Sequence, residues 1–478
     1  MKIPVAFLNK AITLLVAFCL YPCVILAASS VDITLDPMSP GATISSNFIG
    51  LSYEMSLVGS ATNGGHFFNP ANKPLVKLFR TLGVQSLRVG GNTAERATVK
   101  IPDTADIDSL FAFARAAGVK VIYTLRLSGT EPADAAKTAK YIMDNYRPEL
   151  TCFELGNEPD KLVKDSQAYG EAMRNYLAVI TAATNAPEAV FCGPSTMHKD
   201  VQWANDFAKD FAHNKHVIMV TQHEYPAGSG RVATNAVTAC KKLLSADLLK
   251  VYEKLYNDFV PTALSSGLQY RLEEANSFSN GGASGASDAF ASALWGLDYM
   301  YWWANRGAAG INFHTGGYAD GARPPEPQKY VVFWNSPEGF AARPLAYAIK
   351  AFDLGCHGQL VPVHFASNPD RVNLTAYGVL SSNGNLYVTL VNKETTGTRD
   401  AKVTITLGGS YTRGQVMFLA APHNDITGTT GVTLGDAPIK DNGDWSASWT
   451  SLAAPLNNGH FSINVSAASA AIVRLTKE

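Results

Sequence analysis

The sequence is poor in cysteine for so long a chain, with six cysteines among 478 residues. Two of them lie within the first 28 residues, and the other four are Cys152, Cys192, Cys240 and Cys356. Four thiols spread over so many residues exclude a small fold held together by disulfides. Cys152 and Cys192 stand in apolar runs, where a buried free thiol is expected. A bridge between Cys240 and Cys356 stays open.

The chain also lacks an excess of either charge, because 39 Lys+Arg residues face 40 Asp+Glu residues. This balance argues against a nucleic-acid partner, which requires a basic surface. Several motifs are missing as well. No G-x-G-x-x-G follows the first apolar run, no G-x-S-x-G is present, and no His/Cys/carboxylate group has metal-ligand spacing. We therefore expect neither a cofactor nor a bound metal.

Long apolar runs are missing everywhere except at the N-terminus. There, Lys2 and Lys10 precede an apolar run that ends in small residues near Ala28. This pattern predicts a secretory signal over residues 1–28, with cleavage after Ala27 or Ala28. The mature chain is then secreted, or periplasmic in a bacterium, and has no membrane partner. Two N-x-S/T sequons, at Asn373 and Asn464, are acceptors for glycans in a eukaryotic secretory pathway.

Short apolar runs alternate with helical patterns between residues 46 and 353. Several of the helical segments end in glycine, as helices do before a following strand. Eight such pairs predict an α/β fold, a (β/α)8 TIM barrel with parallel strands. The expected strands lie within 47–54, 85–91, 119–127, 150–157, 189–195, 217–225, 269–276 and 310–316.

The pattern changes after residue 353. Residues 354–478 alternate apolar and polar side chains, and "SSNGNL" between two such runs predicts a hairpin. We therefore expect an antiparallel β-sandwich. Residues 29–45 alternate in the same way and are expected to add the mature N-terminal strand to this sandwich. No Pro/Ser-rich linker separates the two parts, so they are expected to pack tightly.

Two pairs of acids stand at the ends of barrel strands. The fourth strand ends in "FELGNEPD" and the seventh in "QYRLEEAN". Functional side chains of such barrels lie at the carboxyl ends of the strands. Pro159 cannot continue a strand, so Glu158 is expected as the last side chain before the loop. Glu154, deeper in the strand, is interpreted as an interior structural acid. Strand alternation says only that Glu273 and Glu274 face opposite ways.

Two carboxyl groups that face one another across a barrel mouth are typical of glycoside hydrolases, in which one protonates the leaving oxygen and the other attacks or activates water. The motifs "FELGNEPD" and "RLEEANSFSNGG" resemble glycoside hydrolase family 79, which contains heparanase and β-glucuronidases. The resemblance implies Glu158 as the acid/base, Glu274 as the nucleophile and Glu273 as its outward neighbour. It also implies that Asn157 binds the sugar 2-hydroxyl group.

Further substrate-binding residues follow from the same resemblance. In "TQHEYP", His223 and Tyr225 line the sugar subsite, with Tyr225 near the nucleophile. Glu54 and Asn92, after the first two strands, are sugar hydrogen-bond partners. Ser279 stands where the family has a tyrosine that binds the substrate carboxylate, while Gly281 and Gly282 leave amides open for an anion.

The expected function is that of a secreted, retaining exo-β-glycosidase with a carbohydrate substrate, and the resemblance implies a β-glucuronidase. Because of Ser279, a neutral-sugar β-glycosidase and a 4-O-methyl-glucuronidase stay open. So do an inactive carbohydrate-binding homologue and an endo-acting enzyme. The Gly/Pro-rich stretch at 314–327 is either an aglycone-shaping loop or an ordinary one, and the aromatic cluster at 299–307 is interpreted as a helix packed on the barrel.

Overall fold

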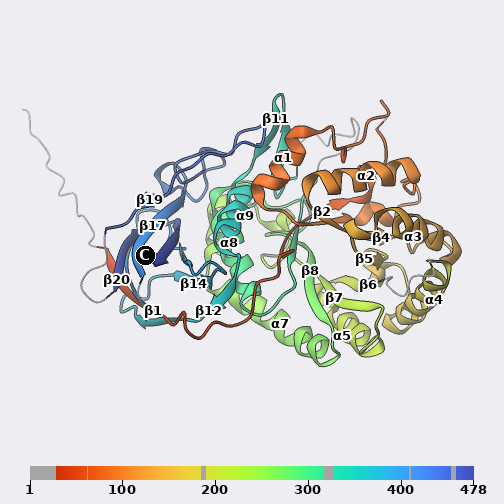
Figure 1. Cartoon of the computed structure of the whole chain (residues 1–478), viewed down its shortest axis with the longest axis horizontal. Helices are drawn as coiled ribbons and strands as arrows, with labels where there is room; N and C mark the ends of the chain where they lie inside the picture. Colours follow the sequence, from red (N-terminus) through yellow and green to blue (C-terminus); the bar gives the residue numbers. More distant parts are fainter. Residues whose placement is uncertain are drawn as a thin grey trace, which may run out of the picture.

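The computed structural model describes residues 28–61, 63–184, 190–316, 328–407, 411–453 and 459–477. Eight strands form a closed barrel in chain order, and every neighbouring pair is parallel (Figure 1). Seven of them lie within runs predicted from the sequence, and β6 extends two residues beyond the predicted 189–195. They are β2 (Ile49–Glu54), β3 (Ser86–Gly90), β4 (Lys120–Leu125), β5 (Leu150–Leu155), β6 (Phe191–Met197), β7 (Val217–Glu224), β8 (Gln269–Ala275) and β9 (Ile311–His314).

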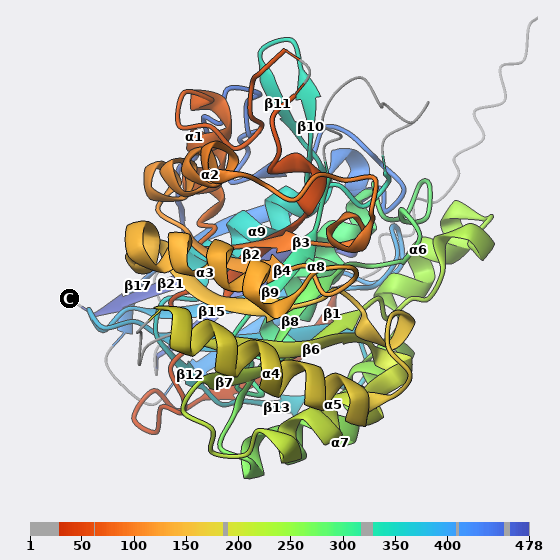
Figure 2. The same cartoon turned by 90° about the vertical axis from the view of Figure 1, so that its right-hand side faces the viewer.

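Helices follow the strands and cover the outside of the barrel (Figure 2). Their ends agree with the sequence signals. Asp103 caps the second helix in a capping box, and Gly83 and Gly118 end the first two helices with left-handed backbone. The helices are α1 (Lys73–Leu82), α2 (Thr104–Ala117), α3 (Pro132–Tyr146), α4 (Ser166–Thr184), α5 (Val201–Asp210), α6 (Ala236–Leu244), α7 (Asp247–Ser265), α8 (Phe290–Ala304) and α9 (Pro344–Gly355).

The second part of the molecule is a sandwich of two sheets that share an apolar core. One sheet has the order β13-β1-β16-β20, and the other runs β12-β14-β15-β21-β17-β18, with β19 paired to β17. Its strands are β1 (Ser29–Leu35), β12 (Gln359–Val361), β13 (Val363–Ser367), β14 (Leu374–Leu380), β15 (Leu386–Asn392), β16 (Ala401–Leu407), β17 (Tyr411–Ala420), β18 (Thr433–Leu434), β19 (Thr450–Ser451), β20 (His460–Val465) and β21 (Ser469–Lys477).

The N-terminal strand β1 belongs to the sandwich, as predicted, and buries Val31, Ile33 and Leu35 there. It pairs antiparallel with β13 but parallel with β16, so this sheet is not wholly antiparallel. The expected hairpin joins β14 to β15 in antiparallel register. A further hairpin, β10 (Phe333–Ser336) with β11 (Gly339–Ala342), precedes α9.

Helices α8 and α9 lie between the barrel and the sandwich (Figure 1). All residues of α8 are buried, which confirms that its aromatic cluster packs inside the molecule. Asp298, in the middle of α8, forms a 2.7 Å ion pair with Lys393 of the sandwich, and both side chains are almost fully buried. The hydroxyl groups of Thr375 and Tyr377 each donate to the same carboxylate at 2.6 Å. The two parts therefore share a buried polar junction, in line with the expected tight packing.

Replacing Asp298 by asparagine is expected to lower the free energy of unfolding by about 3 kcal/mol, because the buried Lys393 ammonium loses its counter-charge. Lys393→Met is expected to be milder, since Asp298 keeps two hydroxyl donors. Thermal and denaturant unfolding measure both changes. Asp134→Asn is the control, because that ion pair with Lys137 is exposed. Equal stability of Asp298→Asn and the control would contradict this reading of the junction.

The remaining sequence predictions have mixed outcomes. All four described cysteines are free and buried, so Cys240 and Cys356 do not form the bridge that was left open. Asn464 is exposed on β20, whereas the Asn373 side chain is half-buried and donates to the Leu244 carbonyl.

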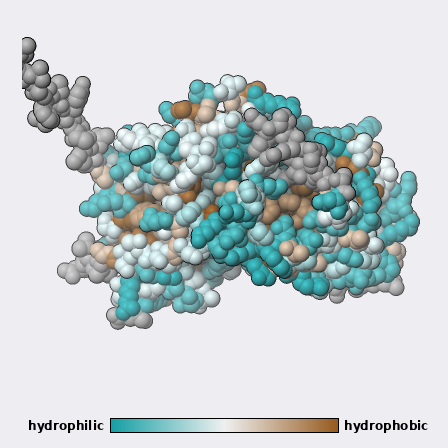
Figure 3. Space-filling view, turned by 90° about the horizontal axis from the view of Figure 1, so that it is seen from above, coloured by the Kyte–Doolittle hydropathy of each residue, from teal (hydrophilic) through white to brown (hydrophobic). Residues whose placement is uncertain are grey.

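The expected signal, apart from Ala28, and residues 317–327 of the Gly/Pro-rich stretch lie outside the described residues. In the part that is described, no helix is long and apolar enough to cross a membrane. The face in Figure 3 is mostly hydrophilic, with apolar residues in small separate areas.

Candidate active site

A cavity of about 530 Å³ opens at the carboxyl ends of the barrel strands. That volume suits a sugar-sized ligand. Seven of the residues predicted from the sequence line it: Glu54, Asn92, Glu158, Tyr225, Glu274, Ser279 and Gly281. Three others, Asn157, His223 and Gly282, do not line the cavity, and Asn157 and His223 are buried beside its two acids.

The sequence predicted Glu158 as the last residue of its strand, but the structure places it in the loop after the strand. Strand β5 ends at Leu155, because Gly156 adopts a φ of 74° and turns the chain out of the sheet. Glu158 itself has left-handed backbone at φ 50°. Such a conformation is costly for a residue with a Cβ and persists only where its surroundings impose it. Here the Glu158 amide donates to the Ser195 carbonyl at 3.1 Å, and Pro159 starts a 3-10 turn.

Glu274, near the end of β8, is held from two sides. The Tyr225 hydroxyl donates to its Oε1 at 2.8 Å, as the resemblance implied. From below, Nη1 of Arg88 donates to its Oε2 at 2.7 Å. Two fixed donors orient the carboxylate and favour its ionised form.

The electrostatic surroundings point the same way. Burial alone raises the pKa of the Glu274 carboxyl. Four neighbouring groups outweigh burial and hold this pKa well below its usual range: His314, His223, Arg88 and Tyr225. Glu274 is therefore a carboxylate at neutral pH, the form that a nucleophile requires.

The two acids face one another closely. One carboxylate oxygen of Glu158, one of Glu274 and a ring nitrogen of His223 all lie within 4.8 Å of one another. Carboxyl groups about 5 Å apart are typical of retaining glycosidases, whereas inverting enzymes leave room for a water between more distant acids. The geometry therefore suits a double displacement.

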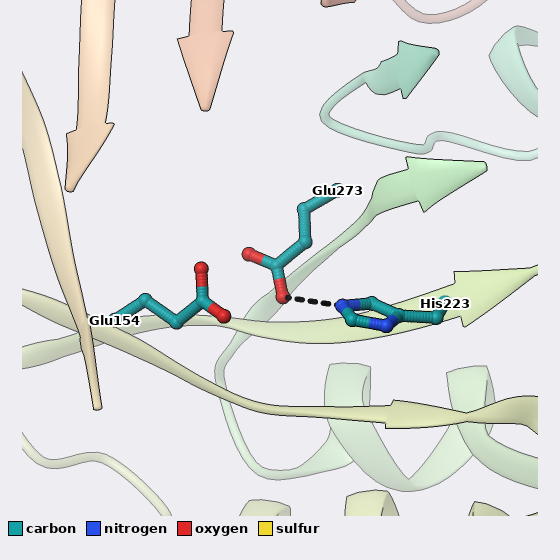
Figure 4. A group of neighbouring side chains, drawn as sticks. All are labelled: Glu154, His223 and Glu273. Atoms are coloured by element: carbon teal, nitrogen blue, oxygen red, sulfur yellow. Dashed lines mark ion pairs between the residues drawn. The ribbon is translucent and has the colours of Figure 1, made fainter. Parts of the chain in front are cut away.

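Glu273 does not point outward, which corrects the sequence interpretation. Gln222 of β7 pairs with Leu272, but His223 pairs with Glu274, so β8 carries an extra residue at Glu273. This bulge turns the Glu273 side chain toward the barrel interior. Its Oε1 lies 3.8 Å from Nε2 of His223 (Figure 4).

Glu154 is an interior acid, as predicted. Arg88 clamps it with Nε to Oε2 at 3.0 Å and Nη2 to Oε1 at 2.8 Å. Thr124 donates to its Oε2 at 2.9 Å. The Arg88 Nη2 group also donates to Oδ1 of Asn157 at 2.7 Å, which fixes the orientation of the carboxamide.

Two groups of carboxylates around His223 have the spacing to hold a metal ion, one with Glu154 and Glu273 and one with Glu158 and Glu274. The first is a poor fit for a cation. Both oxygens of Glu154 are already engaged by Arg88, whose charge repels a metal. Arg88 also bonds Glu274 in the second group.

The loops after the first two strands shape one wall of the cavity. Glu54 accepts the Thr93 amide at 2.8 Å and the Thr93 hydroxyl at 2.6 Å, and Asn92 is exposed beside it. Gly91 has a φ of 67°, and a Cβ there would lie 2.7 Å from the Glu54 carboxyl. Glycine is therefore required for this close approach.

The loop after β8 forms another wall. Ser279 donates its amide to the Gly228 carbonyl at 2.9 Å and accepts from the Gly230 amide at 3.0 Å, so the loops after β7 and β8 are joined. The Gly282 amide donates to the Ser279 carbonyl at 3.3 Å. It is thus not open for an anion, contrary to the expectation from the sequence, while Gly281 does line the cavity.

Several lining residues were not predicted. Three are cations, and the others are mainly polar or aromatic: Lys161, Lys199, Arg231, Met197, Asn280, His314, Gln328 and Tyr330. Arg88, beneath the cavity, was missed as well. Its signal was present, because an arginine within the apolar run "SLRVG" requires buried acids as partners.

No family model matches the chain. A β-glucuronidase from Aspergillus niger is 27% identical to it over 196 residues, and this match spans 35% of each chain. Two solved structures share the fold over most of the chain. A 4-O-α-L-rhamnosyl-β-D-glucuronidase from Fusarium oxysporum 12S, in complex with Rha-GlcA, has a TM-score of 0.68 at 17% identity and covers 93% of this chain and 99% of its own. A GH51 arabinofuranosidase from Xanthomonas axonopodis pv. citri has a TM-score of 0.69 at 13% identity and covers 94% and 100%.

The chain therefore has the fold of (β/α)8 glycoside hydrolases with an appended β-sandwich. In sequence it is a distant homologue of a β-glucuronidase, over about a third of that relative's length.

Proposed function

We propose that the protein is a retaining exo-β-glycosidase that removes a terminal β-linked glucuronate from a glycan. Glu158 protonates the leaving oxygen while Glu274 attacks the anomeric carbon and forms a covalent glycosyl intermediate. Glu158 then takes a proton from water, which hydrolyses that intermediate. The carrying observation is the pair of facing acids, one of them held ionised by Arg88 and Tyr225.

The cations around the cavity support a uronate as the sugar. Lys161, Lys199 and Arg231 line the same space as the two acids. When Glu158 is protonated, these three cations outnumber the two other acids of the lining, Glu54 and Glu274, which makes the cavity attractive to an anion. These cations could bind the substrate carboxylate in place of the family's tyrosine, whose position is occupied here by Ser279. The distant β-glucuronidase homologue supports the same sugar. The chain is further proposed to be exported, on the strength of its N-terminal segment.

Aryl glycosides separate the candidate sugars. The aryl β-glucuronide is expected to be cleaved with a kcat/KM at least ~10-fold above that of the matched β-glucoside, because a charge-assisted hydrogen bond to the carboxylate is worth about 1.5–3 kcal/mol. The panel also includes the β-galactoside, the 4-O-methyl-glucuronide and the α-L-arabinofuranoside. If one of these glycosides is cleaved best, its sugar replaces glucuronate as the proposed substrate. If the protein binds glycosides but cleaves none of them, it is an inactive homologue.

Glu158→Gln is expected to show a defect that depends on the leaving group. With phenyl β-glucuronide, kcat/KM is expected to fall by ~100- to 10,000-fold, because general acid catalysis is lost. A dinitrophenyl glucuronide leaves without a proton and is expected to keep most of its first-step rate, measured as a burst of dinitrophenol. Glu171→Gln, on the exposed face of α4, is the control. An equal loss on both substrates would show that Glu158 is not the acid.

A further inference from the structure

His223 connects the proposed acid/base to a second, deeper acid. The ring is fully buried and lies between the carboxyl group of Glu158, in the loop after β5, and that of Glu273, on β8. Its Nδ1 is 3.2 Å from Oε1 of Glu158, and its Nε2 is 3.8 Å from Oε1 of Glu273. Figure 4 shows the Glu273 carboxyl directed at the ring from β8. Nδ1 also lies 3.9 Å from Oε1 of Glu274, so the imidazole has the two acids of the cavity on one side and Glu273 on the other.

The contact between His223 and Glu273 lacks a hydrogen bond, and forming one requires a proton on one of the two facing atoms. Nε2 of His223 and Oε1 of Glu273 are both buried, and neither has a hydrogen-bond partner among the described residues. Two buried polar atoms left unpaired would each be costly. A small rotation of the Glu273 side chain brings them within hydrogen-bond distance and satisfies both, provided that one of them carries the proton.

The surroundings decide which atom carries it. Glu273 faces Glu154, Arg88 and Arg271, with the Cys192 thiol 3.8 Å from its Oε2 and the Ser195 hydroxyl nearby. Arg88 is a single cation shared between two carboxylates, those of Glu154 and Glu274. Burial, followed by the charge of Glu154, raises the pKa of Glu273 to about 7, whereas burial lowers the pKa of His223. Below neutral pH, a protonated Glu273 thus faces a neutral imidazole.

We propose that Glu273 is a positioning residue that fixes the tautomer of His223 and, through it, the orientation of Glu158. The Glu273 O–H donates to Nε2, so the single imidazole proton resides on Nδ1 and is donated to Oε1 of Glu158. The inference rests on the proposed role of Glu158 as acid/base. It leaves Oε2, which contacts Lys161 at the cavity wall, as the oxygen that exchanges its proton with the leaving group.

The arrangement also supports the second half of the reaction. Once Glu158 has given up its proton, the Nδ1–H bond stabilises the carboxylate that remains. When the pH rises through about 7, Glu273 loses its proton and accepts from Nε2–H instead. Nδ1 then accepts from Glu158 and draws its proton away from the cavity. Activity therefore falls on the alkaline side.

Two variants of similar length separate this role from simple packing. Glu273→Gln keeps an N–H donor for Nε2 but does not titrate, whereas Glu273→Met has no donor. On phenyl β-glucuronide, Glu273→Met is expected to have a kcat/KM roughly tenfold below that of Glu273→Gln, with little difference on a dinitrophenyl leaving group. The alkaline limb of the pH profile is expected to move to higher pH in Glu273→Gln.

A second measurement does not depend on activity. Nitrogen NMR of histidine-labelled protein reports which ring nitrogen carries the proton, and His223→Gln identifies the signals. Below neutral pH, the wild type and Glu273→Gln are expected to show the Nδ1–H form, and Glu273→Met is expected to lose it. The same tautomer in all three, or an Nε2–H form in the wild type, would overturn the proposal. So would identical pH profiles in the two variants. If no glycoside is cleaved, the glycosidase proposal fails, and the NMR result still decides the tautomer.

Discussion

Glu274→Ala is expected to lower kcat for every substrate, whatever its leaving group, by at least ~10,000-fold. The reason is that the ionised carboxylate held by Arg88 and Tyr225 is the only group proposed to attack the anomeric carbon. Without it, no covalent intermediate forms, and the stabilisation of positive charge at the transition state is lost as well. Steady-state hydrolysis of the dinitrophenyl glucuronide measures this loss with the greatest sensitivity.

Azide makes the same experiment diagnostic. In Glu274→Ala it occupies the space of the carboxylate and is expected to give a glycosyl azide of inverted configuration. In Glu158→Gln it attacks the intermediate and is expected to give the retained product. Glu253→Ala, on the exposed face of α7, controls for general effects of losing an acid. Glu274→Ala with near-normal activity, or a retained azide product from it, would assign the nucleophile to another residue.

The barrel could be predicted because its signals are local. Each strand is an apolar run buried on both faces, and glycines such as Gly83 and Gly118 mark where the helices before β3 and β4 end. Eight repetitions of this pattern leave little choice of architecture. The parallel pairing of β1 with β16 could not be predicted, since alternation gives the face of a strand but not its partner.

The sequence predicted which residues surround the site but not the directions of their side chains. The prediction assumed that side chains alternate regularly along β5 and β8. Gly156 ends β5 early, and a bulge gives β8 an extra residue, so Glu273 and Glu274 both lie inside the barrel. A bulge depends on the neighbouring strand, here on the pairing of His223 with Glu274, and a single sequence does not contain that information.

Arg88 was missed for a related reason. Its partners, Glu154, Asn157 and Glu274, lie 66, 69 and 186 residues away in the chain. Only closure of the barrel brings them together. What the sequence does offer is the charge itself, because an arginine in a strand buried on both faces must find acids there.

Arg88→Met is expected to affect both stability and chemistry. It leaves two buried carboxylates, Glu154 and Glu274, without their cation, which is expected to lower the free energy of unfolding by about 3–5 kcal/mol. It also removes one of the groups that depress the pKa of Glu274, so that pKa rises. Because a carboxylate is needed for attack, the acidic limb of kcat/KM moves to higher pH. Denaturant unfolding and the pH profile measure the two effects.

Arg271→Met is the matched control, because Arg271 is a second buried arginine of the same barrel. It donates to Oδ1 of Asn312 and to backbone carbonyl groups rather than to the acids of the site. Its loss is expected to destabilise the fold while leaving the acidic limb in place. Arg88→Lys keeps one charge and serves if Arg88→Met does not fold, with a smaller shift in the same direction. If all three variants have the wild-type acidic limb, Arg88 does not hold Glu274 ionised, and its place in the site is structural.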